Sequence, residues 1–183
     1  MSSRISQSEF VAMMAMMIAT VAFSIDSMLP AMPQIATELS PDAPNKSQFI
    51  LSSFMVGMGI GTLFTGPLSD AFGRKTMINL GAALYILGAA LAWTAPTLEL
   101  MIAARIMQGI GAAGPRIVSL AIVRDLFSGR EMARIVSFIM IVFTIVPALA
   151  PLLGSGIMAI GGWRSIFLAF LLFSVISVLW LNV

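Results

Sequence analysis

The sequence contains no cysteine and no histidine, and only 10% of its 183 residues are charged. Without these two residue types the chain has no disulfide and no thiol nucleophile, and it lacks the usual ligands of zinc and haem. Proton chemistry must use carboxylates, because no imidazole is present. A net charge of +2 does not indicate a basic nucleic-acid surface. We therefore expect no metal, no cofactor, no nucleic-acid partner and no enzymatic activity.

Hydrophobic residues make up 59% of the chain, and the mean hydropathy is +1.01. Ordinary soluble domains are about 25% charged and under half apolar, so this composition indicates a surface that faces lipid. Six stretches reach the roughly 20 apolar residues that a helix needs to cross a bilayer. The expected spans are residues 10–37, 47–69, 76–98, 100–123, 135–160 and 164–183. The predicted fold class is an all-α integral membrane protein with six transmembrane helices.

Basic residues in the expected loops are distributed unequally between the two sides of the membrane. One side receives Arg4, Arg74, Lys75, Arg124, Arg130 and Arg134, whereas the other receives Lys46 and Arg164. Cytoplasmic loops carry an excess of lysine and arginine. Both termini are therefore expected in the cytoplasm.

Three charged residues, Asp26, Arg105 and Arg116, lie inside expected spans. A charge at mid-depth costs roughly 2.5 to 3.5 kcal/mol on insertion scales and by default marks a functional site. From the helical rise, Asp26 and Arg105 reach a similar depth, so we expect them to pair directly or through water. Arg105, Gln108 and Arg116 share one helix face, which is expected to line a central cavity with Arg116 accessible to water. The alternatives are an inert buried ion pair, and an Arg116 that reaches lipid phosphates.

Glycine and proline within the expected spans each permit two interpretations. Gly57 and Gly109 allow helices to approach closely, which for a single glycine is ordinary packing in a membrane bundle. Pro147 and Pro151 remove backbone donors and bend a helix. Bends are typical of a moving bundle, but they are equally compatible with a static one.

The turn between the second and third expected spans carries a charged motif. It reads Gly66-Pro-Leu-Ser-Asp70-Ala-Phe-Gly73-Arg74-Lys75. Asp70, near a helix end, is placed to pair with Arg74 or with a helix terminus, and Gly73 permits a tight turn. The segment resembles the signature loop of the major facilitator superfamily, in which Gly, Asp, Gly, Arg and Lys recur at these separations.

Three further segments agree with this resemblance. Arg105–Ala113 resembles the fourth-helix motif of proton-driven facilitators, and Ser24–Pro33 resembles the first-helix motif of drug exporters. The bicyclomycin and chloramphenicol resistance exporters are similar to the third segment, Arg124–Glu131 followed by Pro147, Pro151, Gly154 and Gly162-Trp163-Arg164. The resemblance implies that Arg105 takes part in proton coupling. It also leads us to expect a cytoplasmic charge cluster of Asp70, Arg74 and Asp125. The fifth-span signature departs from the family pattern, because Ala150 and Ser155 stand where glycines are usual, and the direction of transport stays open.

A faint internal repeat accompanies these motifs. Gly73 and Arg74 are echoed about 90 residues later by Gly162 and Arg164, which indicates two three-helix units, as in the nested repeats of one transporter half. The fold expected is therefore half of a major facilitator fold.

The resemblance implies the amino-terminal six-helix half of a proton-coupled multidrug exporter in a bacterial-type inner membrane, working by alternating access. Asp26 is the expected proton-carrying acid. The implied partners are a small amphipathic drug-like substrate, protons, the lipid bilayer and a second six-helix half. Two alternatives remain: a metabolite–proton symporter of the same fold, and a non-transporting half-protein that acts as a membrane interaction partner.

Overall fold

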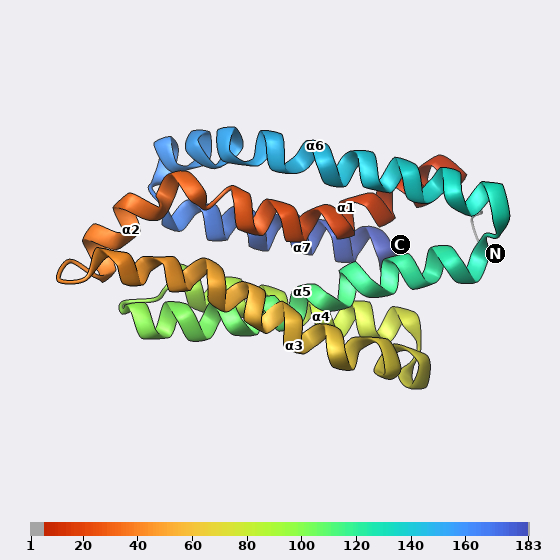
Figure 1. Ribbon diagram of the computed structural model, residues 1–183, viewed down its shortest axis with the longest axis horizontal. Helices are drawn as coiled ribbons and strands as arrows, with labels where there is room; N and C mark the ends of the chain where they lie inside the picture. The colour runs from red at the N-terminus through yellow and green to blue at the C-terminus, as the bar shows by residue number, and fades with distance from the viewer. Residues whose placement is uncertain (1–5, 183) are drawn as a thin grey trace.

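The structure is a computed structural model that describes residues 6–182. Within that range all regular elements are helical, and six candidate spans are long and apolar enough to cross a membrane. The elements are α1 (Gln7–Asp26), the 3₁₀ helix η1 (Leu29–Ala31), α2 (Met32–Leu39), the 3₁₀ helix η2 (Pro44–Gln48), α3 (Phe49–Phe72), α4 (Arg74–Trp93), α5 (Leu98–Leu126), α6 (Gly129–Gly161) and α7 (Arg164–Asn182). They form an elongated bundle (Figure 1). The predicted all-α membrane architecture is confirmed.

Local sequence signals determine where two of the helices begin. Ser6 accepts a hydrogen bond from the Glu9 amide (3.2 Å), and Thr97 accepts one from the Leu100 amide (3.3 Å). These hydroxyl caps satisfy amide groups that have no carbonyl partner inside the helix. Glu99, in the first turn of α5, also lies near the positive end of that helix's dipole.

The span expected over residues 10–37 is present, but it is divided. α1 ends at Asp26, and the chain passes through η1 before α2 begins at Met32. Pro30 and Pro33 lack the amide hydrogen that would continue the helical hydrogen bonds, and their rings crowd the carbonyls one turn earlier. Asp26 is therefore the last residue of a helix, and it lies next to a bend in the backbone.

Other helix ends differ from the expected spans where a proline or a charge lies near the boundary. α4 ends at Trp93 rather than at residue 98, since Pro96 disfavours helical geometry in the residue before it. α6 begins at Gly129 rather than at residue 135 and includes charged residues in its first turns. A helix continues through charges that lie outside the hydrocarbon, so an uncharged stretch gives only a minimum helix length.

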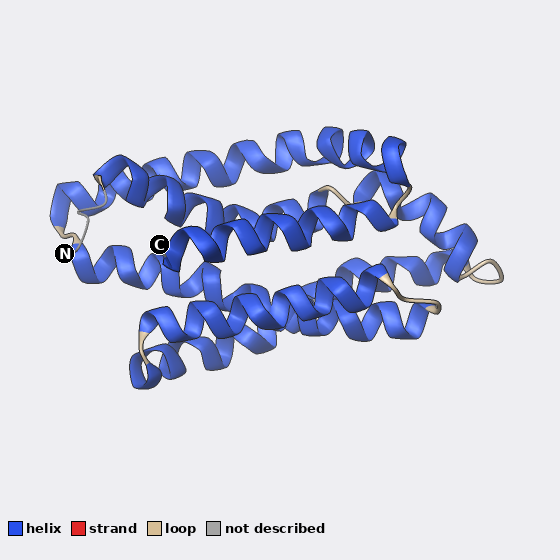
Figure 2. Cartoon of the chain, turned by 180° about the vertical axis from the view of Figure 1, so that it is seen from behind, coloured by secondary structure: helices blue, strands red, loops and turns tan. Residues whose placement is uncertain are grey.

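Two groups of helices make up the bundle. α5 packs along α3 and α4, whereas α1 packs against α6, and α4 also contacts α7. Figure 1 shows α1, α6 and α7 on one side and α3, α4 and α5 on the other, and Figure 2 shows the same division from behind. The first helix of each predicted three-helix unit thus packs against the second helix of the other unit. The two units are intertwined rather than placed side by side.

The two ends of the bundle are named here by their arginines. At the Arg74 end α1 begins, α3 meets α4, and α5 meets α6; at the Arg164 end α2 meets α3, α4 meets α5, and α6 meets α7. Trp180 donates a hydrogen bond to Glu9 (3.3 Å). The last helix therefore ends beside the start of α1, at the Arg74 end.

Large apolar side chains cover much of the outside of the bundle. Leu63 on α3 and Leu152 on α6 are both 72% exposed. Soluble monomers rarely present apolar surface on this scale, whereas lipid or another helical unit accommodates it. The helices and their exposed surface together describe a multi-pass membrane protein.

Glycines on α3 and α5 allow these two helices to touch along their main chains. A methyl group built on Gly57 would overlap the Ile106 carbonyl, and one built on Gly109 would overlap the Phe54 carbonyl. Each helix therefore contributes a glycine against which the main chain of the other helix packs. Here the ordinary packing interpretation of these glycines is sufficient.

We expect Gly57→Ala to lower the free energy of unfolding by roughly 1–3 kcal/mol, because overpacking a tight interface forces the backbones apart. Gly59→Ala is the matched control, since a methyl group there meets no atom within 4 Å. Both changes give the same intrinsic gain in helix propensity, so their difference isolates packing. Unfolding of the chain in mixed micelles measures it, and equal stabilities of the two variants would contradict the close contact.

Candidate functional site

Arg105, in the first third of α5, is fully buried at the centre of a three-helix contact. Its guanidinium donates to the Ser24 carbonyl of α1 (3.0 Å), the Ile50 carbonyl of α3 (3.4 Å) and Oε1 of Gln108 (2.7 Å). It also lies 4.4 Å from the ring centroid of Phe54, where a cation–π attraction adds to the hydrogen bonds. Arg105 therefore joins α1, α3 and α5 through one charged side chain.

The predicted direct pair between Asp26 and Arg105 is not formed. Within residues 6–182 the ion pairs involve Arg74 and Arg164 only, and Asp26 is partly exposed at the end of α1. The expected pairing rested on the depth of each residue along its helix axis. It did not include the angle at which each side chain leaves its helix. Residues two apart on a helix point about 200° apart, so α1 presents Ser24 to Arg105 while the Asp26 side chain leaves from another face.

A chain of hydroxyl groups extends from Arg105 toward α4. Ser24 Oγ donates to the Thr20 carbonyl (2.6 Å), so its contact with the Tyr85 hydroxyl (2.5 Å) has tyrosine as the donor. Gln108 Nε2 is buried nearby and is the one such side-chain atom without a hydrogen-bond partner among the described residues. Tyr85 is not among the site residues expected from the sequence. The available signal was that it is the only tyrosine in the chain.

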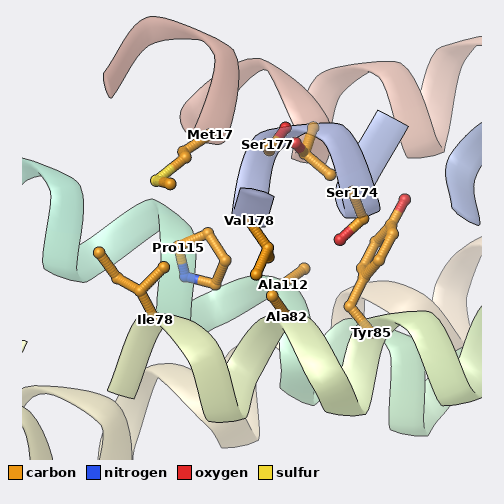
Figure 3. A pocket seen from close by; sticks show the side chains of 10 residues that line it. Met17, Ile78, Ala82, Tyr85, Ala112, Pro115, Ser174, Ser177 and Val178 are labelled. Carbon is orange, nitrogen blue, oxygen red and sulfur yellow. The ribbon is translucent and has the colours of Figure 1, made fainter. Parts of the chain in front are cut away.

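A small cavity lies beside Tyr85, between α1, α4, α5 and α7. Its volume is about 10 Å³, enough for one water molecule. Figure 3 shows Tyr85 from α4 and both Ser174 and Ser177 from α7 around it, with Pro115 of α5 opposite. The buried polar groups of this region therefore continue across the bundle from Arg105 to α7.

The signature turn forms the charge cluster that its sequence predicts. Arg74 pairs with Asp70 (2.6 Å) and with Asp125 at the end of α5 (2.9 Å), and it donates to Ser69 Oγ (2.6 Å). Gly73 has a φ of +91°, a conformation that favours glycine, and it ends α3 immediately before Arg74 begins α4. The turn thus places one arginine between two carboxylates from different helices.

The other two residues of the motif have no such packing role in the described structure. A methyl group built on Gly66 meets nothing within 4 Å, and Lys75 is exposed. Lys75 forms no ion pair with any residue in the range 6–182. Packing within this chain therefore does not explain either residue.

Arg116 belongs to the Arg74 end rather than to the network around Arg105. With Asp70, Arg74 and Arg124 it lines a hollow of about 510 Å³ between α3 and α5. Its Nη1 lies 3.9 Å from the sulfur of Met58, and its side chain is half-buried. The structure thus separates Arg116 from Arg105 and Gln108, and its accessibility to water stays a prediction.

The predicted bend residues of α6 lie where this helix passes the bend after α1. Pro147 and Pro151 are inside the helix, and a methyl group on Gly154 would overlap the Ser27 carbonyl. Ala150, one turn before Gly154, is fully buried. Gly154 therefore allows α6 to touch the backbone immediately after Asp26.

Known proteins resemble this chain in sequence and in fold. Residues 12–183 match the profile described as Major Facilitator Superfamily. The chain is 37% identical to the bicyclomycin resistance protein homolog of Haemophilus influenzae and 36% identical to the multidrug resistance protein MdtL of Escherichia coli, in each case over 145 residues and 79% of this chain. These alignments cover 36% and 37% of the two relatives, so the chain spans little more than a third of their length.

A solved structure of a D-xylose-proton symporter superposes with a TM-score of 0.75 at 19% identity, covering 94% of this chain and 47% of that protein. At that identity the likeness shows the fold. The profile match covers nearly the whole chain and agrees with the signature turn and the six-helix bundle. This chain therefore belongs to the Major Facilitator Superfamily.

Proposed function

We propose that this chain is the amino-terminal six-helix half of a proton-coupled exporter of amphipathic drug-like molecules. The names of the two relatives, which refer to bicyclomycin and multidrug resistance, support the substrate class. The chain aligns with about a third of those relatives and about half of the symporter. The proposed partner is therefore a second six-helix half, with the substrate bound between the halves and exposed to each side in turn.

The burial of Arg105 is the observation that carries the proposal. Its guanidinium is fully buried, and among residues 6–182 no carboxylate pairs with it. A desolvated charge in a membrane span weakens folding unless it is compensated, and such charges generally mark ion or substrate pathways. The groups that face this guanidinium, two main-chain carbonyls, Gln108 Oε1 and the Phe54 ring, carry no negative charge. We propose that Arg105 is retained because transport uses its charge.

Asp26 is the proposed proton carrier. It ends α1 two residues after Ser24, whose carbonyl accepts from Arg105, and it adjoins the contact between Ser27 and Gly154. A movement of α6 against α1 would therefore change the surroundings of Asp26 and its distance from Arg105. Such a change alters proton affinity by altering both solvation and the nearby positive charge.

A groove between α1 and α6 supports the proposal that the substrate is amphipathic. It has a volume of about 430 Å³, and Val11, Ala15 and Phe138 are among the apolar residues that line it. Arg134 lies at the same groove, with its guanidinium 5.8 Å from the Phe138 ring centroid. Apolar walls with few polar groups are typical of small-molecule sites.

We propose that the Arg74 end faces the cytoplasm of a cell with a bacterial-type inner membrane. In the turns and helix ends on this side the basic residues are Arg74, Lys75, Arg124, Arg130 and Arg134, against Lys46 and Arg164 at the other end. Arg4, the remaining residue of the predicted basic side, lies outside the described residues. This imbalance supports cytoplasmic termini by the positive-inside rule.

Proteoliposomes that contain the complete twelve-helix transporter test this function. With ethidium as the substrate, antiport predicts that an imposed proton gradient drives the dye against its own gradient, and that added dye releases protons in the opposite direction. Dye and protons moving in the same direction would instead identify a symporter. Correct insertion without any dye movement, with a range of amphipathic dyes, would favour the non-transporting alternative.

Asp70→Asn is expected to slow transport roughly three- to fivefold, because it removes one of the two carboxylates that hold Arg74 and an exposed ion pair contributes up to about 1 kcal/mol. Insertion should be unchanged. Asp42→Asn is the matched control, since Asp42 is exposed at the Arg164 end. Dye flux and thiol accessibility at each end give the readout. If both stay at wild-type values, the cluster does not stabilise an end state of the cycle.

A further inference from the structure

A second charge cluster lies at the Arg164 end, and the transport proposal does not use it. Glu38, at the end of α2, pairs with Arg164 at the start of α7 and accepts a hydrogen bond from Trp163 Nε1 (2.6 Å). Arg164 also donates to the Ala95 carbonyl in the turn between α4 and α5 (3.4 Å). The cluster therefore joins three separate segments of the chain at this end.

Trp163 fixes the position of this cluster. Its side chain is only 1% exposed and makes an edge-to-face contact with Phe167 (ring centroids 6.1 Å apart), while the Arg164 guanidinium lies 4.2 Å from its ring centroid. A buried indole has little freedom to move. Glu38 is thus held by one rigid donor and one charged donor from consecutive residues, which makes the contact stronger than an ordinary exposed ion pair.

The two clusters are related by the internal repeat. In each three-helix unit, a glycine with positive φ ends the second helix, with φ of +91° at Gly73 and +71° at Gly162, and an arginine then begins the third helix. Arg74 of the first unit pairs with Asp125, at the end of the first helix of the second unit. Arg164 of the second unit pairs with an acid at the end of the first unit's opening segment.

This reciprocity also follows from chain direction. Each unit crosses the bundle three times, an odd number, so the second unit is inverted relative to the first, and equivalent positions lie at opposite ends of the bundle. Glu38 is the counterpart of Asp125, and Arg164 is the counterpart of Arg74. The repetition of Gly73 and Arg74 as Gly162 and Arg164 therefore corresponds to the same type of ion pair at each end of the bundle.

We propose that the Glu38–Trp163–Arg164 cluster is a lock for the Arg164 end, equivalent to the Asp70–Arg74–Asp125 cluster at the Arg74 end, and that each lock holds only its own end of the six-helix unit closed. Each cluster joins the two intertwined three-helix units where the long helices end. Loss of one cluster loosens the nearby turns and leaves the opposite end ordered. Both locks are formed within this chain, so they do not depend on whether the protein exports drugs.

Thiol labelling tests the proposal. Because the chain has no cysteine of its own, a reagent labels only the cysteine that is introduced. Ala95→Cys reports on the Arg164 end and Val123→Cys reports on the Arg74 end, since both residues are fully buried. Each reporter is combined in turn with Glu38→Gln and with Asp125→Asn in the whole chain in nanodiscs. A water-soluble maleimide then measures the opening rate at each end.

We expect Glu38→Gln to raise labelling of the Ala95→Cys reporter about tenfold, the factor that corresponds to losing a hydrogen bond to a charged group, and to leave the Val123→Cys reporter unchanged. Asp125→Asn should give the reverse pattern. Glu38→Gln combined with Arg164→Gln should give no more than the effect of Arg164→Gln alone, because Arg164→Gln already removes the ion pair that Glu38→Gln removes. Equal effects at both ends, unchanged labelling, or additive effects of the two changes would each overturn the proposal.

Discussion

Asp26→Asn is expected to abolish substrate-driven proton movement while leaving membrane insertion and fold unchanged. Asparagine has nearly the same shape as aspartate but does not carry a proton at any relevant pH. Among the described acidic residues of the six spans, Asp26 lies away from both ends of the bundle, whereas Glu38, Asp70 and Asp125 lie at the ends. With no histidine available, a carboxylate is the group in these spans that is able to titrate near neutral pH.

The structure adds a reason why this change should be tolerated by the fold. Asp26 makes no ion pair within residues 6–182 and is partly exposed, so neutralising it removes no stabilising contact of that kind. A pH-sensitive dye inside proteoliposomes of the complete transporter measures proton movement when ethidium is added, with Asp42→Asn as the control. Wild-type coupling in the Asp26→Asn variant would move the coupling acid into the second six-helix half.

Arg105→Ala is expected to lower the free energy of unfolding by roughly 3 kcal/mol and to impair both substrate binding and coupling. It removes the guanidinium donor from the Ser24 carbonyl and from Gln108 Oε1, and it leaves a void beneath Phe54. The Ile50 carbonyl also loses this donor but keeps the Ser53 hydroxyl (3.0 Å). Arg105→Lys should recover little of this loss. A lysine amine lacks the planar fork that reaches three acceptors while stacking on a ring.

Arg105→Met separates the structural role of this residue from its functional one. Methionine refills the void without burying a charge, so much of the stability should return, while coupling should remain lost if transport needs the positive charge. Unfolding in mixed micelles and proton movement in proteoliposomes are measured on the same variants, with Lys46→Met as the control, since Lys46 is exposed at the Arg164 end. Normal coupling in a stable Arg105→Met variant would remove Arg105 from the proposed mechanism.

The sequence determined those features of this protein that depend on residues near one another in the chain. Six apolar stretches of sufficient length specify six spans. Lipid offers no hydrogen-bond partners to the backbone, and an apolar stretch of this length satisfies its own backbone groups by forming a helix. The Asp70–Arg74 ion pair was predictable for the same reason: Asp70 is one helical turn away, and the intervening Gly73 allows the tight turn. Charged residues and prolines moved individual helix ends by less than two turns, and these shifts changed no element type.

Tertiary structure decided which side chains meet in the middle of the bundle. Asp26 and Arg105 share a depth but not a direction, since the rotation of α1 about its own axis depends on all its neighbours, and it brings the Ser24 carbonyl to Arg105 instead. Gly154 likewise meets the Ser27 carbonyl, and Glu38 meets Trp163, across more than 120 positions of sequence. Every residue has a main-chain carbonyl, so no residue pattern marks the ones that will hold a buried arginine. Only the packing of α1, α3 and α5 brings those carbonyls to one point.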